Sequence, residues 1–199
     1  MKSLSLFAAV LLIATLLVAV LPTEAEAKIY EDTLRLHILA ASDSEADQAL
    51  KICLRDKILE KYGSILAEAE SRGEAEVLVG ELLSDIEANA QRWVRDWGYS
   101  YSVKATLTEE WYDTRVYEDF TLPAGVYTSL RVIIGSGEGK NWWCVMYPPL
   151  CIDIATENAP GDDALIDYTD AETNLITGDG YNIKFKLLEI ISAIFSQNG

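Results

Sequence analysis

The chain has 199 residues, with 32 acidic and 16 basic side chains and a formal net charge of −16 at pH 7. Such an acidic surface repels nucleic acid and anionic lipid, and no Lys/Arg cluster offsets the charge locally, so we expect binding to neither. The length is within the range of one domain with a real hydrophobic core.

The amino terminus has the pattern of a signal peptide. Lys2 supplies a positive charge, residues 4–21 form an almost unbroken apolar run, and Ala25-Glu26-Ala27 is a small-x-small cleavage site. The run is also long enough to span a bilayer, so an uncleaved anchor is the alternative. In either case we expect residues 1–27 to be the export signal and residues 28–199 to form a single exported domain.

The first half of the remaining chain predicts a strand followed by two helices. Residues 34–39 alternate apolar and polar side chains, which indicates a half-buried strand. A capping box at residues 42–45, with Ser42 or Ser44 as the cap, begins a helix with an apolar residue at every fourth position; Gly63 or Ser64 is its expected end.

A second capping box, Ser71 with Glu74, begins the next helix, and Gly98 is its expected end. The alternating residues 99–107 then predict a strand covered on one side, and residues 114–117 are candidates to pair with it.

The second half predicts a hairpin. Residues 126–134 read as a strand, 135–141 as a flexible turn, and 142–147 as a strand that is apolar on both faces and therefore the expected sheet centre. Residues 155–180 predict a long surface excursion, and residues 187–195 carry the core face of a terminal helix. Strands and helices without βαβ regularity favour an α+β fold, with a mostly antiparallel sheet packed against amphipathic helices.

Three cysteines, Cys53, Cys144 and Cys151, leave at least one thiol free or paired between chains. Pro148-Pro149 can turn the chain back far enough for Cys144 to meet Cys151 in a disulfide; the alternative is two small buried hydrophobic side chains. We expect Cys53 to be unpaired. The chain lacks CxxC and clustered histidines, so we expect no zinc site, and no other metal or cofactor motif occurs.

The glycine-rich residues 135–141 superficially resemble a phosphate loop. A Walker loop needs four residues between its glycines and a Ser or Thr after the lysine; here three residues intervene and Asn141 follows Lys140. Glu138 would also repel phosphate. A hairpin turn is the better interpretation, and we expect no small-molecule substrate.

His37 is the only histidine, so any histidine-dependent catalysis must use it. It lies beside Arg35 on the polar face of the first strand, with Asp43 and Asp47 close in sequence. No nucleophile motif accompanies it, which favours a structural histidine that ties strand to helix. A secreted hydrolase using His37 is the alternative.

Trp142 and Trp143 occupy neighbouring strand positions, so we expect one indole in the core and the other available to a partner. For Arg131 we expect a paired, structural role. An aromatic anchor beside polar side chains is typical of a binding surface. The candidate contact residues are Arg35, His37, Asp43, Lys140, Asn141, Trp142 and Trp143; the competing interpretation is that all of them hold the fold together.

Two blocks of sequence resemble the stage II sporulation protein R family. The first is Leu34-Arg35-Leu36-His37-Ile38-Leu39-Ala40 with the following Ser42-Asp43-Ser44, and the second is Gly139-Lys140-Asn141-Trp142-Trp143-Cys144 with Pro148-Pro149-Leu150-Cys151. The resemblance implies a non-enzymatic signalling protein made in the forespore and exported into the space between forespore and mother cell. Its implied partner is a membrane-embedded aspartic peptidase of the mother cell, which processes the precursor of sigma factor E.

Overall fold

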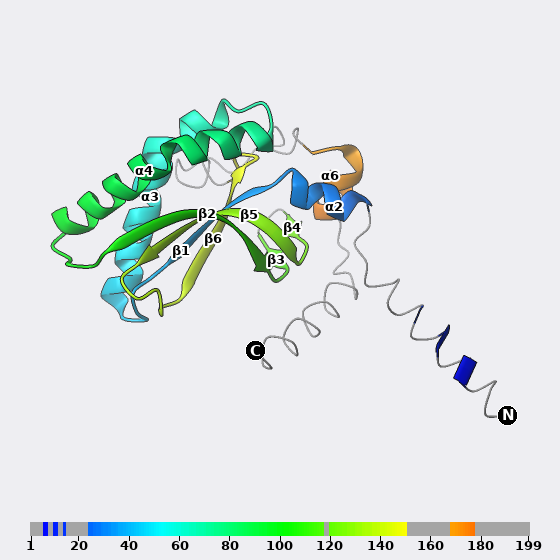
Figure 1. Ribbon diagram of the computed structural model, residues 1–199, viewed down its shortest axis with the longest axis horizontal. Coiled ribbons are helices and arrows are strands. Elements are labelled where there is room, and N and C mark those ends of the chain that lie inside the picture. The colour runs from blue at the N-terminus through cyan, green and yellow to red at the C-terminus, as the bar shows by residue number, and fades with distance from the viewer. Residues whose placement is uncertain are drawn as a thin grey trace. The chain divides into compact units, whose positions relative to one another are not determined.

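A computed structural model of the chain describes residues 6–7, 10–11, 14, 24–117, 120–150 and 168–177 (Figure 1). Its helices and strands, in chain order, are α2 (Glu24–Glu31), β1 (Leu34–Leu39), α3 (Glu45–Ala67), α4 (Arg72–Asp96), β2 (Val103–Tyr112), β3 (Arg115–Val116), β4 (Thr121–Leu122), β5 (Gly125–Ile134), β6 (Asn141–Tyr147) and α6 (Asp170–Thr177). These elements confirm the α+β class.

The chain divides into two compact units. The larger comprises Tyr30–Glu110 and Val126–Thr169, and the smaller comprises Met1–Ile29, Trp111–Gly125 and Asp170–Gly199. Whether residues 28–199 behave as one domain stays a prediction. Among the residues described, no helix combines the length and apolar character that crossing a membrane requires. Most of the expected leader, and the helix expected over 187–195, lie outside the described residues.

The larger unit contains a four-stranded sheet with the order β2-β5-β1-β6. β1 runs parallel to β5 and antiparallel to β6, so the sheet is mixed. The strand at 142–147 was expected at the sheet centre, but β6 lies at one end of this order and β1 and β5 are central. The predicted hairpin is also wrong, because β1 lies between β5 and β6.

Helices α3 and α4 pack against one face of the sheet (Figure 1). The Trp142 side chain lies on that face, because the guanidinium of Arg55 in α3 is 4.9 Å from its ring centroid. Ile38 is the register partner of Trp142, so its side chain lies on the same face. Leu34 and Leu36 share the face by alternation and are fully buried. The predicted alternation is therefore correct.

The expectation that β1 is half-buried is wrong, since all six of its residues are buried. Aromatic side chains of the two neighbouring strands cover part of its polar face. Arg35 lies against the ring of Tyr127 in β5, and His37 stacks on Trp143 in β6. A central strand flanked on both sides thus buries its polar face too.

Both predicted capping residues begin their helices. Ser44 accepts a hydrogen bond from the backbone N–H of Asp47, and Ser71 accepts one from Glu74. α3 continues through the expected stop at Gly63 to Ala67. Gly63 is buried and lies beside Met146 of β6, so packing against the sheet outweighs the low helix propensity of glycine.

Gly98 ends α4 as predicted. It has φ +88°, and its N–H donates to Arg95 O while the N–H of Tyr99 donates to Val94 O, which is a Schellman motif. β2 then begins at Val103, later than expected, and its first residues are held by α4. Val103 N–H donates to Gln91 Oε1.

In the smaller unit, β3 and β4 form an antiparallel pair in which Arg115 is opposite Leu122. The prediction that residues 114–117 pair with β2 is therefore wrong, because pairing with the nearby β4 closes only a short loop. The range 155–180, expected as a surface excursion, contains α6 at Asp170–Thr177, and the rest of it lies outside the described residues.

Candidate functional site

The connection from β5 to β6, residues 135–140, crosses the end of β1 and is called here the crossover loop. Because β1 lies between β5 and β6, the loop passes over the residues that join β1 to α3. Gly139 N–H donates to Ala40 O at 2.9 Å, and Ser136 Oγ donates to Ala41 O at 3.0 Å. The expected flexible turn is thus a segment held against the strand–helix junction.

Two further contacts hold the end of this loop on α3 and its cap. The backbone N–H of Lys140 donates to Asp43 Oδ1 at 2.6 Å, and Lys51 Nζ donates to the carbonyl oxygen of Lys140 at 2.9 Å. The approach is too close for a side chain at Gly139, where a Cβ atom would lie 2.3 Å from Ser42 O. The glycine-rich composition therefore serves close packing of two backbones rather than phosphate binding.

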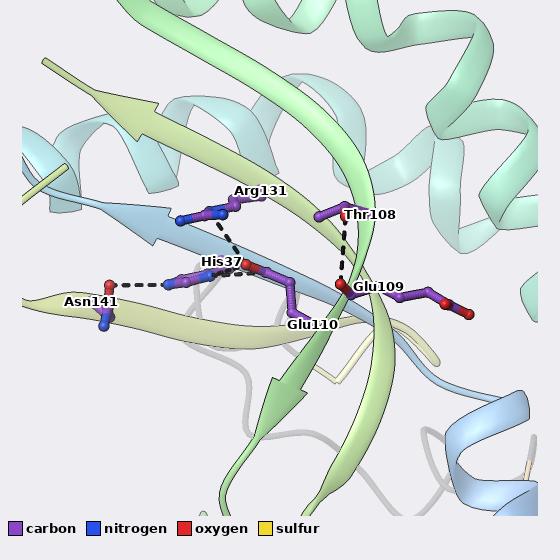
Figure 2. A network of polar contacts seen from close by, with 6 residues as sticks. All are labelled: His37, Thr108, Glu109, Glu110, Arg131 and Asn141. Carbon is purple, nitrogen blue, oxygen red and sulfur yellow. Dashed lines mark hydrogen bonds and ion pairs between the residues drawn. The ribbon is translucent and has the colours of Figure 1, made fainter. Parts of the chain in front are cut away.

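On the sheet face opposite α3, a group of polar side chains meets at His37 (Figure 2). His37 Nδ1 lies 3.0 Å from Glu110 Oε2, and Nε2 lies 3.0 Å from Asn141 Oδ1. Arg131 Nε lies 3.3 Å from Glu110 Oε1. Since a carboxylate only accepts hydrogen bonds, Nδ1 carries a proton and donates to Glu110. These four residues, the His37 network, join β1, β2, β5 and β6.

The protonation of Glu110 reflects competing effects. Burial favours the neutral acid, but the hydrogen bond from His37 and the charges of His37 and Arg131 outweigh it and hold the pKa of Glu110 below its usual range. Glu110 is therefore a carboxylate at neutral pH. His37 ties strands together through it, whereas the sequence suggested a tie from strand to helix.

The acids near His37 in sequence have other partners. Asp47 accepts hydrogen bonds from Ser42 Oγ at 2.5 Å and Tyr101 Oη at 3.3 Å, and Asp43 accepts from Lys140. Nε2 of His37, the atom that would activate a nucleophile, faces the Asn141 amide. These contacts of His37 with Glu110, Asn141 and Trp143 are those of a structural histidine.

The two tryptophans lie on opposite faces of β6. Trp142 contacts Arg55 on the α3 side, and Trp143 stacks on His37 with ring centroids 5.7 Å apart and an interplanar angle of 24°. Both side chains are half-buried. The expectation that one indole enters the core is wrong, because β6 lies at one end of the described sheet order.

Burial divides the seven candidate contact residues into two groups. Arg35 is fully buried and His37 is 8% exposed, so neither side chain offers much accessible area for a contact. The side chains of Asp43, Lys140 and Asn141 are exposed, and the tryptophans are half-buried. The accessible candidates all lie around the crossover loop and the first residues of β6.

The cysteines follow the prediction as far as they are described. Cys53 is a free, exposed thiol, and Cys144 is disulfide-bonded. Cys151 lies outside the described residues, so its pairing with Cys144 stays a prediction. Arg131 forms the ion pair expected of a structural arginine.

Sequence reasoning missed Glu110 and Lys51. Glu110 lies 73 positions after His37 and beyond the predicted end of its strand, and only the period-two pattern continued past residue 107 could have placed it on the same face. Within the described ranges, no group of three or more His, Cys, Asp and Glu side chains could hold a metal ion.

Comparison with known proteins agrees with the sequence blocks that meet at this site. Residues 30–157 match the model of the family described as Stage II sporulation protein R (spore_II_R). The chain is 31% identical over 185 residues to the Stage II sporulation protein R of Bacillus subtilis (strain 168), covering 83% of each chain. No solved structure matches the chain. On these matches, the chain belongs to the stage II sporulation protein R family and has a role in sporulation.

Proposed function

We propose that this protein is an exported, non-enzymatic signal between the two compartments of a sporulating cell. It is made in the forespore, leaves through its amino-terminal leader, and acts in the space between the forespore and mother-cell membranes. There it activates a membrane-embedded aspartic peptidase of the mother cell, which then processes the precursor of sigma factor E. The family membership and the leader pattern support this assignment.

The surface proposed to contact the peptidase is the junction between the crossover loop and the residues that join β1 to α3. The two sequence blocks that carry the family resemblance are about a hundred residues apart, yet they interlock: Gly139 and Lys140 hydrogen-bond to Ala40 and Asp43. The accessible candidate side chains on this junction are Asp43, Lys140, Asn141 and the half-buried Trp142 and Trp143. Together they supply an aromatic anchor with a polar rim, which is the usual composition of an energetic centre in a protein interface.

Activation by a ligand of this kind is a shift of populations. The protein must bind the active conformation of the peptidase more tightly than the inactive one, because equal affinity for both would change nothing. No chemistry is required of the protein itself. The acidic surface of the chain, with a net charge of −16, favours a receptor surface of opposite charge.

A secreted hydrolase is the second candidate, favoured by the His37–Glu110 pair, since a carboxylate behind a histidine is the arrangement of a general base. Against it, Nε2 faces Asn141 and the ring is mostly buried. A hydrolase would cleave substrate without any peptidase present.

Reconstitution tests the proposal directly. The exported protein, the membrane-embedded peptidase in vesicles and the sigma-factor precursor are combined, and each component is omitted in turn. We expect cleavage only when all three are present. Cleavage by the exported protein and precursor alone would instead favour the hydrolase, and equal cleavage with and without the exported protein would contradict activation.

A further inference from the structure

Lys51 is a lysine of α3 whose side chain is turned inward, and it is only 4% exposed. Lysine is almost never this buried unless its ammonium is paired. Its Nζ lies 2.6 Å from Gln48 Oε1, 2.9 Å from Lys140 O and 3.4 Å from Asn141 O. These three acceptors match the three N–H donors of an ammonium group.

Other lysines of α3 behave differently. The side chains of Lys57 and Lys61 are 45% and 41% exposed and pair with carboxylates, Glu60 at 2.6 Å and Asp85 at 3.0 Å. Lys51 instead donates to backbone carbonyls that lie 89 and 90 residues away in the chain. Lys51 therefore links α3 to the crossover loop and the start of β6.

The two peptide groups that flank the Cα of Lys140 are both held. Its N–H donates to Asp43 Oδ1 and its carbonyl oxygen accepts from Lys51 Nζ. With both peptide planes fixed, the direction in which the exposed Lys140 side chain leaves the backbone is fixed as well. Gln48 completes the arrangement, because its Nε2 donates to Ser42 O, the same carbonyl that Gly139 approaches.

We propose that Lys51 is a positioning residue, whose buried ammonium fixes the crossover loop and the start of β6 in the conformation that meets the partner. The link to the partner rests on the function proposed above; the fixing of the loop does not. A loop ordered before association loses little conformational freedom when the complex forms, which favours binding. Lys51 thus supports activation without touching the peptidase.

The test compares Lys51→Met with Lys57→Met in the full exported protein. Methionine keeps an unbranched side chain and removes the ammonium, and Lys57 offers the same change at an exposed position of the same helix. We expect backbone amide exchange at Gly139 and Lys140 to become at least tenfold faster in Lys51→Met and to be unchanged in Lys57→Met. Activation of the peptidase should fall in the first variant only.

A second pair of variants leaves Lys51 unchanged; one of them disturbs the same loop and the other is its control. Gly139→Ala places a methyl group against Ser42 O, whereas Gly80→Ala adds one where no heavy atom lies within 4 Å. If Lys51→Met does not fold, Lys51→Gln takes its place, because glutamine retains a donor but has a shorter reach. We again expect faster amide exchange at Gly139 and Lys140 and reduced activation of the peptidase.

The outcomes separate the two proposals. Unchanged exchange at Gly139 and Lys140 in a folded Lys51 variant overturns the positioning role. Faster exchange with full activation would show that Lys51 anchors the loop. It would also show that this loop is not part of the surface that contacts the peptidase. Faster exchange with reduced activation supports both. If the unaltered protein does not activate the peptidase, the exchange measurements still decide the role of Lys51.

Discussion

His37 and Glu110 are 73 residues apart in the chain, and Nδ1 of the histidine lies 3.0 Å from Oε2 of the carboxylate. This pair joins β1 to β2, although β5 lies between these strands in the sheet. Because the carboxylate is largely buried, its removal should affect stability, and its titration should make that stability depend on pH.

Replacing Glu110 by Gln should lower the free energy of unfolding at pH 7 by roughly 1.5–3 kcal/mol, the usual worth of a hydrogen bond to a charged group. The pKa of Glu110 is depressed in the folded protein, so the unfolded chain takes up its proton first as the pH falls. This contribution is therefore complete above about pH 4.3 and is lost as the pH falls through the folded pKa.

Urea unfolding at a series of pH values measures how the contribution of Glu110 to the free energy of unfolding depends on pH. The difference between the unaltered protein and Glu110→Gln should shrink below about pH 4. Glu109→Gln, at the exposed neighbouring position, is the matched control and should leave the pH profile unchanged. Identical profiles for all three proteins would contradict the role of the pair.

Trp143→Ala should weaken binding to the peptidase by at least about 2 kcal/mol, or about 30-fold in Kd, if the indole is an anchor of the interface. Loss of its stack on His37 should reduce stability by roughly 1 kcal/mol beyond the contribution of the apolar area that the half-buried indole covers. Trp97→Ala is the control, since Trp97 is an exposed tryptophan at the end of α4. Binding and thermal unfolding are measured on the same samples; a loss of binding only in step with unfolding excludes the surface role.

Gly98→Ala should destabilise the protein by roughly 1–2 kcal/mol, because alanine at φ +88° is sterically strained. Gly80→Ala, at an exposed position inside α4, should stabilise by roughly 0.5–1 kcal/mol. Denaturant unfolding of the two variants should therefore give shifts of opposite sign. A stabilising effect at position 98 would show that the helix ends differently in solution.

Without reductant, a maleimide should label one thiol, that of Cys53. Cys144 should be recovered in a disulfide-linked peptide with Cys151, since Pro148-Pro149 shortens the path between them. Mass spectrometry of the labelled and digested protein identifies the labelled Cys53 peptide and the disulfide-linked peptide. Labelling at Cys144 in the native protein would be incompatible with the bond.

Exported material should begin at Lys28, because Ala25 and Ala27 fit the subsites of a signal peptidase. Cleavage there falls within α2, at the fourth peptide bond of the helix. Intact mass measurement distinguishes this product from the anchored alternative, which would retain Met1.

The sequence alone determined the local features of this protein. Ser44 and Ser71 begin the two long helices and Gly98 ends the second, because capping depends on atoms only a few residues apart. The alternation in residues 34–39 assigned Leu36 and His37 to opposite faces for the same reason.

Only the tertiary structure decided the strand order and the site. The position of β6 at one end of the described order, the continuation of α3 through Gly63 and the pairing of His37 with Glu110 all depend on contacts between residues distant in the chain. Such contacts are selected by burial and by satisfaction of polar groups in the complete fold, which no short window of sequence contains. The crossover loop shows this most directly. Its glycines predicted a flexible turn, but hydrogen bonds to Ala40, Asp43 and Lys51, in a segment about 90 residues earlier, hold it in place.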